Sequence, residues 1–161
     1  MEFAPRRNTG NTSANTAFVR EIYQRFIEEF NTVAEYTAIA SAASDRYPAV
    51  AKLFDELARV ELAHHTRLGQ ILRRLGVERA LQWRGSQGGG RRQASPFASE
   101  AATAALFEAK IAGEMEDAAT YRRLMRDAND MRIAAILQEI ATEEEGHATA
   151  LAAMQARLGR S

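Results

Sequence analysis

Cysteine is absent from this chain of 161 residues. Its absence excludes disulfides, iron–sulfur clusters, thiolate zinc sites and thiol catalysis, so oxygen and imidazole are the metal ligands on offer. The chain also lacks an excess of charge of either sign, because 21 basic residues balance 21 acidic ones. No large electrostatic field therefore draws it to nucleic acid or to an anionic membrane.

Long apolar runs are missing as well. No uninterrupted stretch approaches the roughly 20 residues that a membrane-spanning helix needs. The segment MEFAPRRNTGNTSANTA lacks the apolar core of a signal peptide, and we interpret residues 1–16 as a flexible polar tail. A cytoplasmic protein with one domain, over residues 17–158, is the expectation from length and composition.

Helix-forming residues dominate what remains, and the apolar periodicity predicts an all-α protein. The expected helices span about 16–43, 48–76, 96–128 and 130–158, with a Gly- and Arg-rich linker at 77–95. Residues suited to helix ends are Pro48, Gly76, the pair Ser95-Pro96, and Asn129 or Asp130. The short turns predict two antiparallel hairpins. The long linker fits either a crossover along the whole bundle or a simple up-down order.

Each predicted helix carries one glutamate in the middle of an otherwise apolar face. Read at steps of three and four, the faces contain Glu29 in the first helix, Glu61 and His64 in the second, Glu114 in the third, and Glu144 and His147 in the fourth. Four buried carboxylates that face one another are costly unless they are neutralised. Two divalent cations would balance them, and one Glu from each of two helices plus Glu-x-x-His from the other two is the dimetal pattern of helix bundles.

The two halves of the chain repeat this pattern. Glu29-x6-Tyr36 precedes Glu61-x-x-His64, and Glu114-x6-Tyr121 precedes Glu144-x-x-His147, with offsets of 85 and 83 residues. The repetition predicts two similar hairpins that face each other about a pseudo-twofold axis, each supplying half of a site.

At these residues the chain resembles the rubrerythrin branch of the ferritin-like superfamily, chiefly in EFNTVAEYTAIAS and ALFEAKIAGEMEDAATY. The resemblance implies a ferritin-like antiparallel four-helix bundle of two pseudo-symmetric hairpins, two Fe ions per site, and reaction with hydrogen peroxide or dioxygen. It assigns as ligands Glu29, Glu61, His64, Glu114, Glu144 and His147. It also implies that Tyr36 and Tyr121 donate hydrogen bonds to carboxylates of the opposite half, and that the protein is a homodimer.

The chain departs from the family pattern at two points. Rubrerythrins usually carry a further glutamate three residues after the third-helix ligand; here that position is Asp117, an additional ligand candidate whose shorter side chain would reach a metal through water. The rubredoxin domain that normally delivers electrons is also missing, because no cysteine is present to bind its iron. Peroxide reduction would then need an external electron donor.

Several alternatives stay open from the sequence. The leading hypothesis is peroxide reduction, the second is a ferroxidase that oxidises Fe(II) with dioxygen, and the third is a metal-free structural bundle; manganese could replace iron in the first two. Residues expected to be ordinary surface or linker residues are Glu28, Glu35, Glu116, Glu143, Glu145, His65 and the arginines of GGGRRQ, whereas Trp83 is expected to anchor the linker to the bundle.

Overall fold

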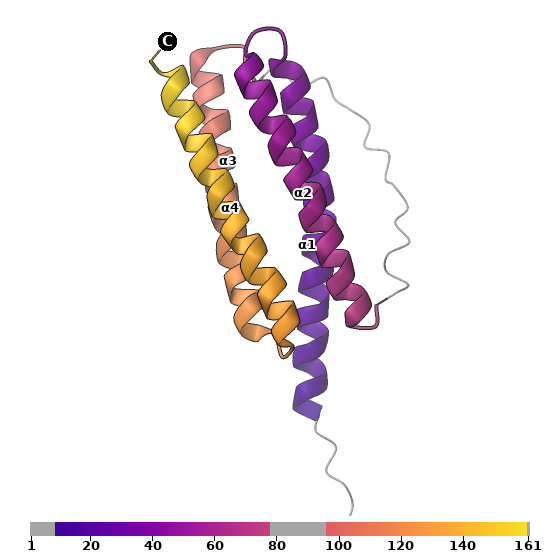
Figure 1. Ribbon diagram of the computed structural model, residues 1–161. Coiled ribbons are helices and arrows are strands. Elements are labelled where there is room, and N and C mark those ends of the chain that lie inside the picture. The colour runs from indigo at the N-terminus through magenta and orange to yellow at the C-terminus, as the bar shows by residue number, and fades with distance from the viewer. Residues whose placement is uncertain (1–8, 78–95, 161) are drawn as a thin grey trace, which may run out of the picture.

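The computed structural model describes residues 9–77 and 96–160, with side chains from residue 16 onward. Its elements are α1 (Thr9–Ala43), α2 (Pro48–Arg74), α3 (Glu100–Asp127) and α4 (Met131–Leu158), and the described residues contain no strand (Figure 1). The helices pack as two hairpins, α1 with α2 and α3 with α4, and α2 packs against α4. The chain is therefore an all-α four-helix bundle, as the periodicity predicts.

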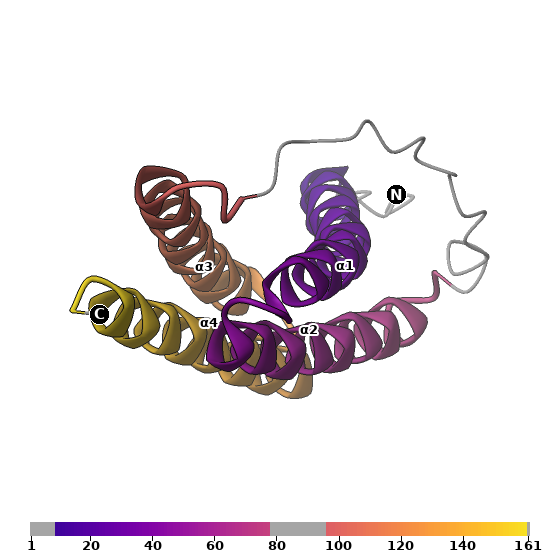
Figure 2. The same ribbon diagram turned by 90° about the horizontal axis from the view of Figure 1, so that it is seen from above.

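The connection between the hairpins is a crossover. The C-terminal end of α2 and the N-terminal end of α3 lie at opposite ends of the bundle (Figure 1). Seen from above, α2 and α4 lie on one side of the bundle, and α1 and α3 on the other (Figure 2). Two ion pairs join α1 to α3, Glu21–Arg123 and Glu35–Lys110, so the residue numbers rise along α1 as they fall along α3. The crossover thus makes these two helices antiparallel and resolves the choice that the linker length left open.

Local sequence explains most of the helix ends. Pro48 occupies the first turn of α2, and the left-handed Gly76 (φ 79°) follows the end of that helix. Asp130 caps α4, because its Oδ1 accepts hydrogen bonds from the backbone N–H groups of Arg132 and Ile133 at 2.8 and 3.3 Å. These three ends agree with the predicted boundaries.

Two helix starts differ from the predicted ones. The first helix begins at Thr9, inside the segment interpreted as a tail, since adding residues to a formed helix costs little even when their propensity is low. The third begins at Glu100, where the Ser99 side chain accepts from Ala102 N at 3.1 Å, so Ser99 replaces the expected cap Ser95. Phe97 instead packs into the core beside Tyr47. The remaining linker predictions, for Ser95, Trp83 and the arginines, lie outside the described residues.

The apolar core consists of two clusters with a polar layer between them. One cluster contains Ile22, Phe26, Leu68, Ile71, Leu72, Tyr121, Leu124, Ile133, Leu137, Ile140 and Ala141. The other contains Tyr36, Ile39, Ala40, Ala43, Val50, Phe54, Leu57, Ala58, Phe97, Phe107 and Leu151. Burial of these side chains holds the helices together above and below the polar layer, and so fixes its position. No helix in the described part of the chain is long and apolar enough to cross a membrane.

Candidate metal centre

The polar layer consists of the six residues that interrupt the apolar helix faces. All are buried, with exposed fractions of at most 6%: Glu29, Glu61, His64, Glu114, Glu144 and His147. Each lies near the middle of its helix because the steps of three and four that bury the apolar neighbours also turn these residues inward. The structure thus brings together all six residues that the sequence singled out on the apolar helix faces.

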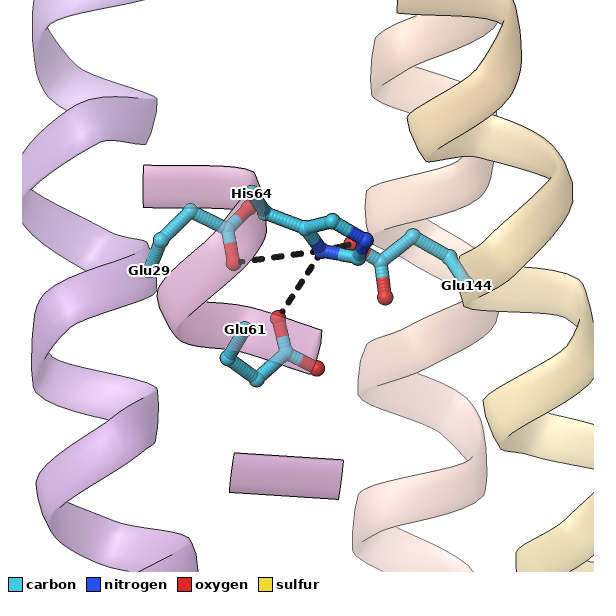
Figure 3. Close-up of side chains that lie close together, drawn as sticks. All are labelled: Glu29, Glu61, His64 and Glu144. Carbon is cyan, nitrogen blue, oxygen red and sulfur yellow. Dashed lines mark hydrogen bonds and ion pairs between the residues drawn. The ribbon is translucent and has the colours of Figure 1, made fainter. Parts of the chain in front are cut away.

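These residues form two groups of four. Ligand atoms of Glu29, Glu61, His64 and Glu144 lie within 4.8 Å of one another (Figure 3), and so do those of a second group, Glu61, Glu114, Glu144 and His147. The His64 Nδ1 atom lies 3.1 Å from Glu61 Oε2, 3.0 Å from Glu144 Oε1 and 3.8 Å from Glu29 Oε2. Each group therefore offers one imidazole nitrogen and three carboxylates, and Glu61 and Glu144 belong to both.

The two shared carboxylates divide their oxygens between the groups. Glu61 directs Oε2 towards His64 and Oε1 towards His147, at 3.1 and 2.9 Å from the respective Nδ1 atoms. Glu144 does the same with Oε1 at 3.0 Å and Oε2 at 3.2 Å. The histidine ring centroids are 5.6 Å apart. Two metal ions, if bound, would therefore share Glu61 and Glu144, whereas Glu29 and Glu114 would be terminal ligands of one ion each.

Two buried tyrosines hold the terminal carboxylates. Tyr36 of α1 donates a hydrogen bond to Glu114 Oε1 of α3, and Tyr121 of α3 donates one to Glu29 Oε1 of α1. Burial, followed by the nearby carboxylates, raises the pKa of both phenols well above its usual value, so both stay protonated donors. The two contacts match each other under the pseudo-twofold relation that the repeat predicts, and they join opposite halves as the family resemblance implies.

Without metal, protons neutralise the layer. Burial alone would lower the pKa of each histidine, but hydrogen bonds to the carboxylates outweigh it and raise the pKa of His64 to about 12 and that of His147 to about 11. Burial raises the pKa of Glu114 to about 7 and that of Glu29 well above its usual range. Burial acts in the same direction on Glu61 and Glu144, but the two histidines close to them prevail and lower the pKa of both. These shifts favour protonated forms of the two histidines, Glu29 and Glu114, and ionised forms of Glu61 and Glu144.

The donor set fits two divalent cations. Glu61 Oε1 and Glu144 Oε2 are buried and accept no hydrogen bond, although each lies close to His147 Nδ1. Both atoms are oriented towards the centre of the second group, where a cation would supply the missing partner. Four carboxylates and two neutral imidazoles also balance the charge of two such ions, and this oxygen-rich set with imidazole suits iron or manganese.

Asp117 stands apart from both groups. Its Oδ1 pairs with Arg25 Nη1 at 2.6 Å, and Arg25 also pairs with Glu28. Burial raises the pKa of Asp117 to about 6, against the pull of Arg25. The structure therefore gives this carboxylate a cationic partner on α1 and leaves its metal role a prediction.

Two contacts beside the layer were not anticipated from the sequence. Glu143 is partly exposed, as its position off the apolar face predicts, yet its Oε2 lies 2.7 Å from His64 Nε2 and also pairs with Arg67. The half-buried His65, expected to be a surface residue, stacks on Phe26 at 3.9 Å between ring centroids and contacts its backbone carbonyl at 2.7 Å. Only the packing between helices creates these contacts, so periodicity along a single helix carries no signal for them.

The fold and the buried carboxylate–histidine layer define the class of the protein: a ferritin-like four-helix bundle with the residues of a dimetal centre. Comparison with family models gives a match to rubrerythrin over residues 24–104. The chain belongs to the rubrerythrin family. No significant match was found among curated proteins or among solved structures.

The matched range covers the first half of the site and none of the residues of the second. It includes Glu29, Tyr36, Glu61 and His64 but ends before Glu114. The second half is placed by the structure, which packs α3 and α4 so that their glutamates and histidine complete the same polar layer. Family membership and geometry therefore support the site from different parts of the chain.

Proposed function

We propose that this protein is a di-iron oxidoreductase that reduces hydrogen peroxide with electrons from a separate donor. The observation that carries the proposal is the pair of four-residue groups that share Glu61 and Glu144. In this proposal Glu29 and His64 hold one ion, Glu114 and His147 hold the other, and the shared carboxylates bridge them. Membership of the rubrerythrin family supports iron as the metal; manganese is the alternative that the same ligands accept.

Bound iron would supply Lewis acidity and two electrons, one from each ferrous ion. One hydrogen peroxide accepts these two electrons and two protons, its O–O bond breaks, and two waters leave. In this proposal the electrons return from a separate carrier, since these 161 residues contain no cysteine that could bind a rubredoxin iron. The balance therefore requires a reductant and a proton source outside the six ligands.

The protein side chains prepare the site for this reaction. The apolar clusters on both sides of the layer exclude water and keep the local dielectric low. Tyr36 and Tyr121 orient Glu114 and Glu29 by hydrogen bonds that cross from one hairpin to the other. Their raised pKa values mean that they remain donors throughout the pH range of an ordinary assay.

Anaerobic loading with Fe(II), followed by hydrogen peroxide and an artificial electron donor, tests the proposal. We expect about two irons per chain and repeated turnover of peroxide that depends on the donor. Glu145→Ala is the matched control for a Glu144 variant, because Glu145 neighbours Glu144 in the sequence but pairs at the surface with Arg122.

Other outcomes distinguish the alternatives. Rapid oxidation of Fe(II) by dioxygen with no donor-dependent peroxide turnover would support the ferroxidase instead. A protein that takes up no iron in anaerobic titration would be a structural bundle, and both redox functions would fall. Sedimentation of the metal-loaded protein tests the homodimer, which remains a prediction from the family.

A further inference from the structure

The surroundings of the two histidines are not alike, although their ligands are. His64 Nδ1 faces the metal ligands, and its other ring nitrogen, Nε2, lies 2.7 Å from Glu143 Oε2. Arg67, one turn after His64 on α2, pairs with the same carboxylate and lies 3.8 Å from Glu139. The His64 ring nitrogen that faces away from the polar layer thus contacts Glu143, and Glu143 is itself paired with Arg67.

The opposite half lacks this pair. Glu61 and Glu144 are related by a shift of 83 residues. Under the same shift, Val60 corresponds to Glu143 and Ala150 corresponds to Arg67. Neither Val60 nor Ala150 can accept a hydrogen bond from an imidazole or pair with a carboxylate. Among the described residues, no hydrogen bond to His147 Nε2 is found, whereas His147 Nδ1 faces three glutamates as His64 Nδ1 does.

A carboxylate behind a histidine fixes which ring nitrogen carries the proton. Because an ionised carboxylate only accepts hydrogen bonds, the proton of a neutral His64 stays on Nε2, and the lone pair of Nδ1 is left for a metal. The same contact fixes the ring orientation and makes the ligand more basic. Loss of such a partner typically costs about 10- to 100-fold in metal affinity.

We propose that Glu143, held by Arg67, is a positioning residue that makes the two metal positions unequal, so that the position at Glu29 and His64 fills first and binds more tightly than the one at Glu114 and His147. This inference rests on the proposed dimetal centre. The ligand sets of the two positions match each other, so the inequality originates in the residues behind the histidines.

Titration of the metal-free protein with Co(II) tests the proposal without any measurement of activity. Co(II) suits the site because it accepts imidazole and carboxylate ligands and has ligand-sensitive visible bands. We expect the wild type to bind two ions in two resolved steps. Glu143→Ala should weaken the first step by about 10- to 100-fold, leave the second nearly unchanged, and alter the visible spectrum of the first ion bound.

Glu139→Ala is the matched control. It removes the same charge from the same face of α4, one turn away, and Glu139 has only a 3.8 Å contact with Arg67. We expect its two binding steps to match those of the wild type. Thermal unfolding of the metal-free variants, followed by circular dichroism, checks that neither substitution disturbs the bundle.

The converse experiment restores the missing partner. Val60→Glu places a carboxylate on α2 at the counterpart of Glu143, and Val60→Gln is its uncharged control. We expect Val60→Glu to strengthen the second binding step and to bring the two steps closer together, and Val60→Gln to do so less.

The outcomes separate this inference from the proposed function. Two bound ions with steps that Glu143→Ala leaves unchanged, or a loss confined to the second step, would overturn the inequality and leave the dimetal centre in place. A wild type that binds no ion, with Co(II) or with Fe(II), would overturn the dimetal centre and the inference with it.

Discussion

The two interfaces between the hairpins neutralise their buried charge in different ways. At the α1–α3 interface, Glu29 and Glu114 have raised pKa values and each accepts a hydrogen bond from a tyrosine of the other helix. At the α2–α4 interface, Glu61 and Glu144 have lowered pKa values and face the two histidines, whose pKa values are raised. Protonation is therefore favoured at carboxyl groups in the first interface and at imidazoles in the second.

The interfaces also differ in symmetry. The α1–α3 contacts exchange roles under the pseudo-twofold relation, with Tyr36 and Glu114 matching Tyr121 and Glu29. The α2–α4 interface has Glu143 behind only one of its histidines. The comparison teaches that the two halves match in the polar-layer residues and in the tyrosines that contact them, but differ in the residue behind the histidine.

Removal of a shared carboxylate should have the largest effect. Glu144→Ala takes one ligand from both groups and leaves His64 and His147 each without one carboxylate contact. We expect metal content to fall from about two ions per chain to less than one. By contrast, Glu29→Ala removes a ligand from one group and should leave about one ion. Elemental analysis after anaerobic loading measures both; equal losses in the two variants would contradict the assignment of terminal and bridging ligands.

Metal binding should release protons from both interfaces. At pH 6 the metal-free site holds about four, on Glu29, Glu114, His64 and His147. Two divalent cations displace them, so we expect the overall binding constant to fall steeply, by up to about 10,000-fold for each unit by which the pH is lowered. Calorimetric titration in two buffers of different ionisation enthalpy counts the protons.

The pH dependence of the stability of the metal-free protein tests the same proton distribution independently. Glu114, with its pKa raised from 4.5 to about 7, binds its proton more tightly in the folded chain, so the stability it contributes is present at low pH and is lost between pH 4.5 and 7. The histidine pKa values, raised from 6.5 to about 11 and 12, extend the loss above pH 6.5. We expect the urea midpoint of the metal-free protein to fall from pH 6 to pH 9, and a rising midpoint would contradict the described proton distribution.

The two tyrosines test the symmetry of the α1–α3 interface. Tyr36→Phe and Tyr121→Phe each remove one buried hydrogen bond to a carboxyl group, and we expect a loss of about 1–3 kcal/mol in the free energy of unfolding for each. The two losses should be similar, because the contacts are related by the pseudo-symmetry. Urea unfolding measures them, with Tyr23→Phe as the control, since its hydroxyl has no hydrogen-bond partner among the described residues.

The smallest expected effect comes from the ion pair at the edge of the α1–α3 interface. Arg25→Ala separates Asp117 from its partner, and both side chains are partly exposed. We expect a loss of about 1 kcal/mol or less. Arg59→Ala, which breaks an exposed pair with Asp55 on α2, should change stability even less. A larger loss for Arg25→Ala would show that Asp117 needs its cation to remain beside the metal layer.

Periodicity within each helix was sufficient to predict the four helices and the polar layer. Glu61 and His64, for example, occupy the same apolar face of α2 because they are one turn apart, and both are buried. The family resemblance implied that Tyr36 and Tyr121 donate hydrogen bonds to carboxylates of the opposite half, and the structure contains both contacts. The assignment of these residues as metal ligands and supporting donors stays a prediction until metal is measured.

Features that depend on how the helices pack against one another were not predicted from the sequence. Glu143 lies one residue before Glu144, so its position on α4 indicated only a solvated side chain; its contact with His64 depends on the close approach of α2 and α4. The crossover was likewise undecided, since a long linker can reach either end of a bundle. The sequence predicted Ser95-Pro96 as the start of the third helix, whereas α3 begins at Glu100 with Ser99 as its cap, so local preference alone selected the earlier serine.

The division of ligands between the hairpins has a mechanical consequence. Each group takes three residues from one hairpin and a single glutamate from the other: Glu144 completes the group of Glu29, Glu61 and His64, and Glu61 completes the group of Glu114, Glu144 and His147. Neither hairpin supplies all four residues of a group, so bound metal would hold the two hairpins together at the middle of the bundle. In a chain without cysteine, metal ligation would then provide the cross-link that disulfides give to other small proteins.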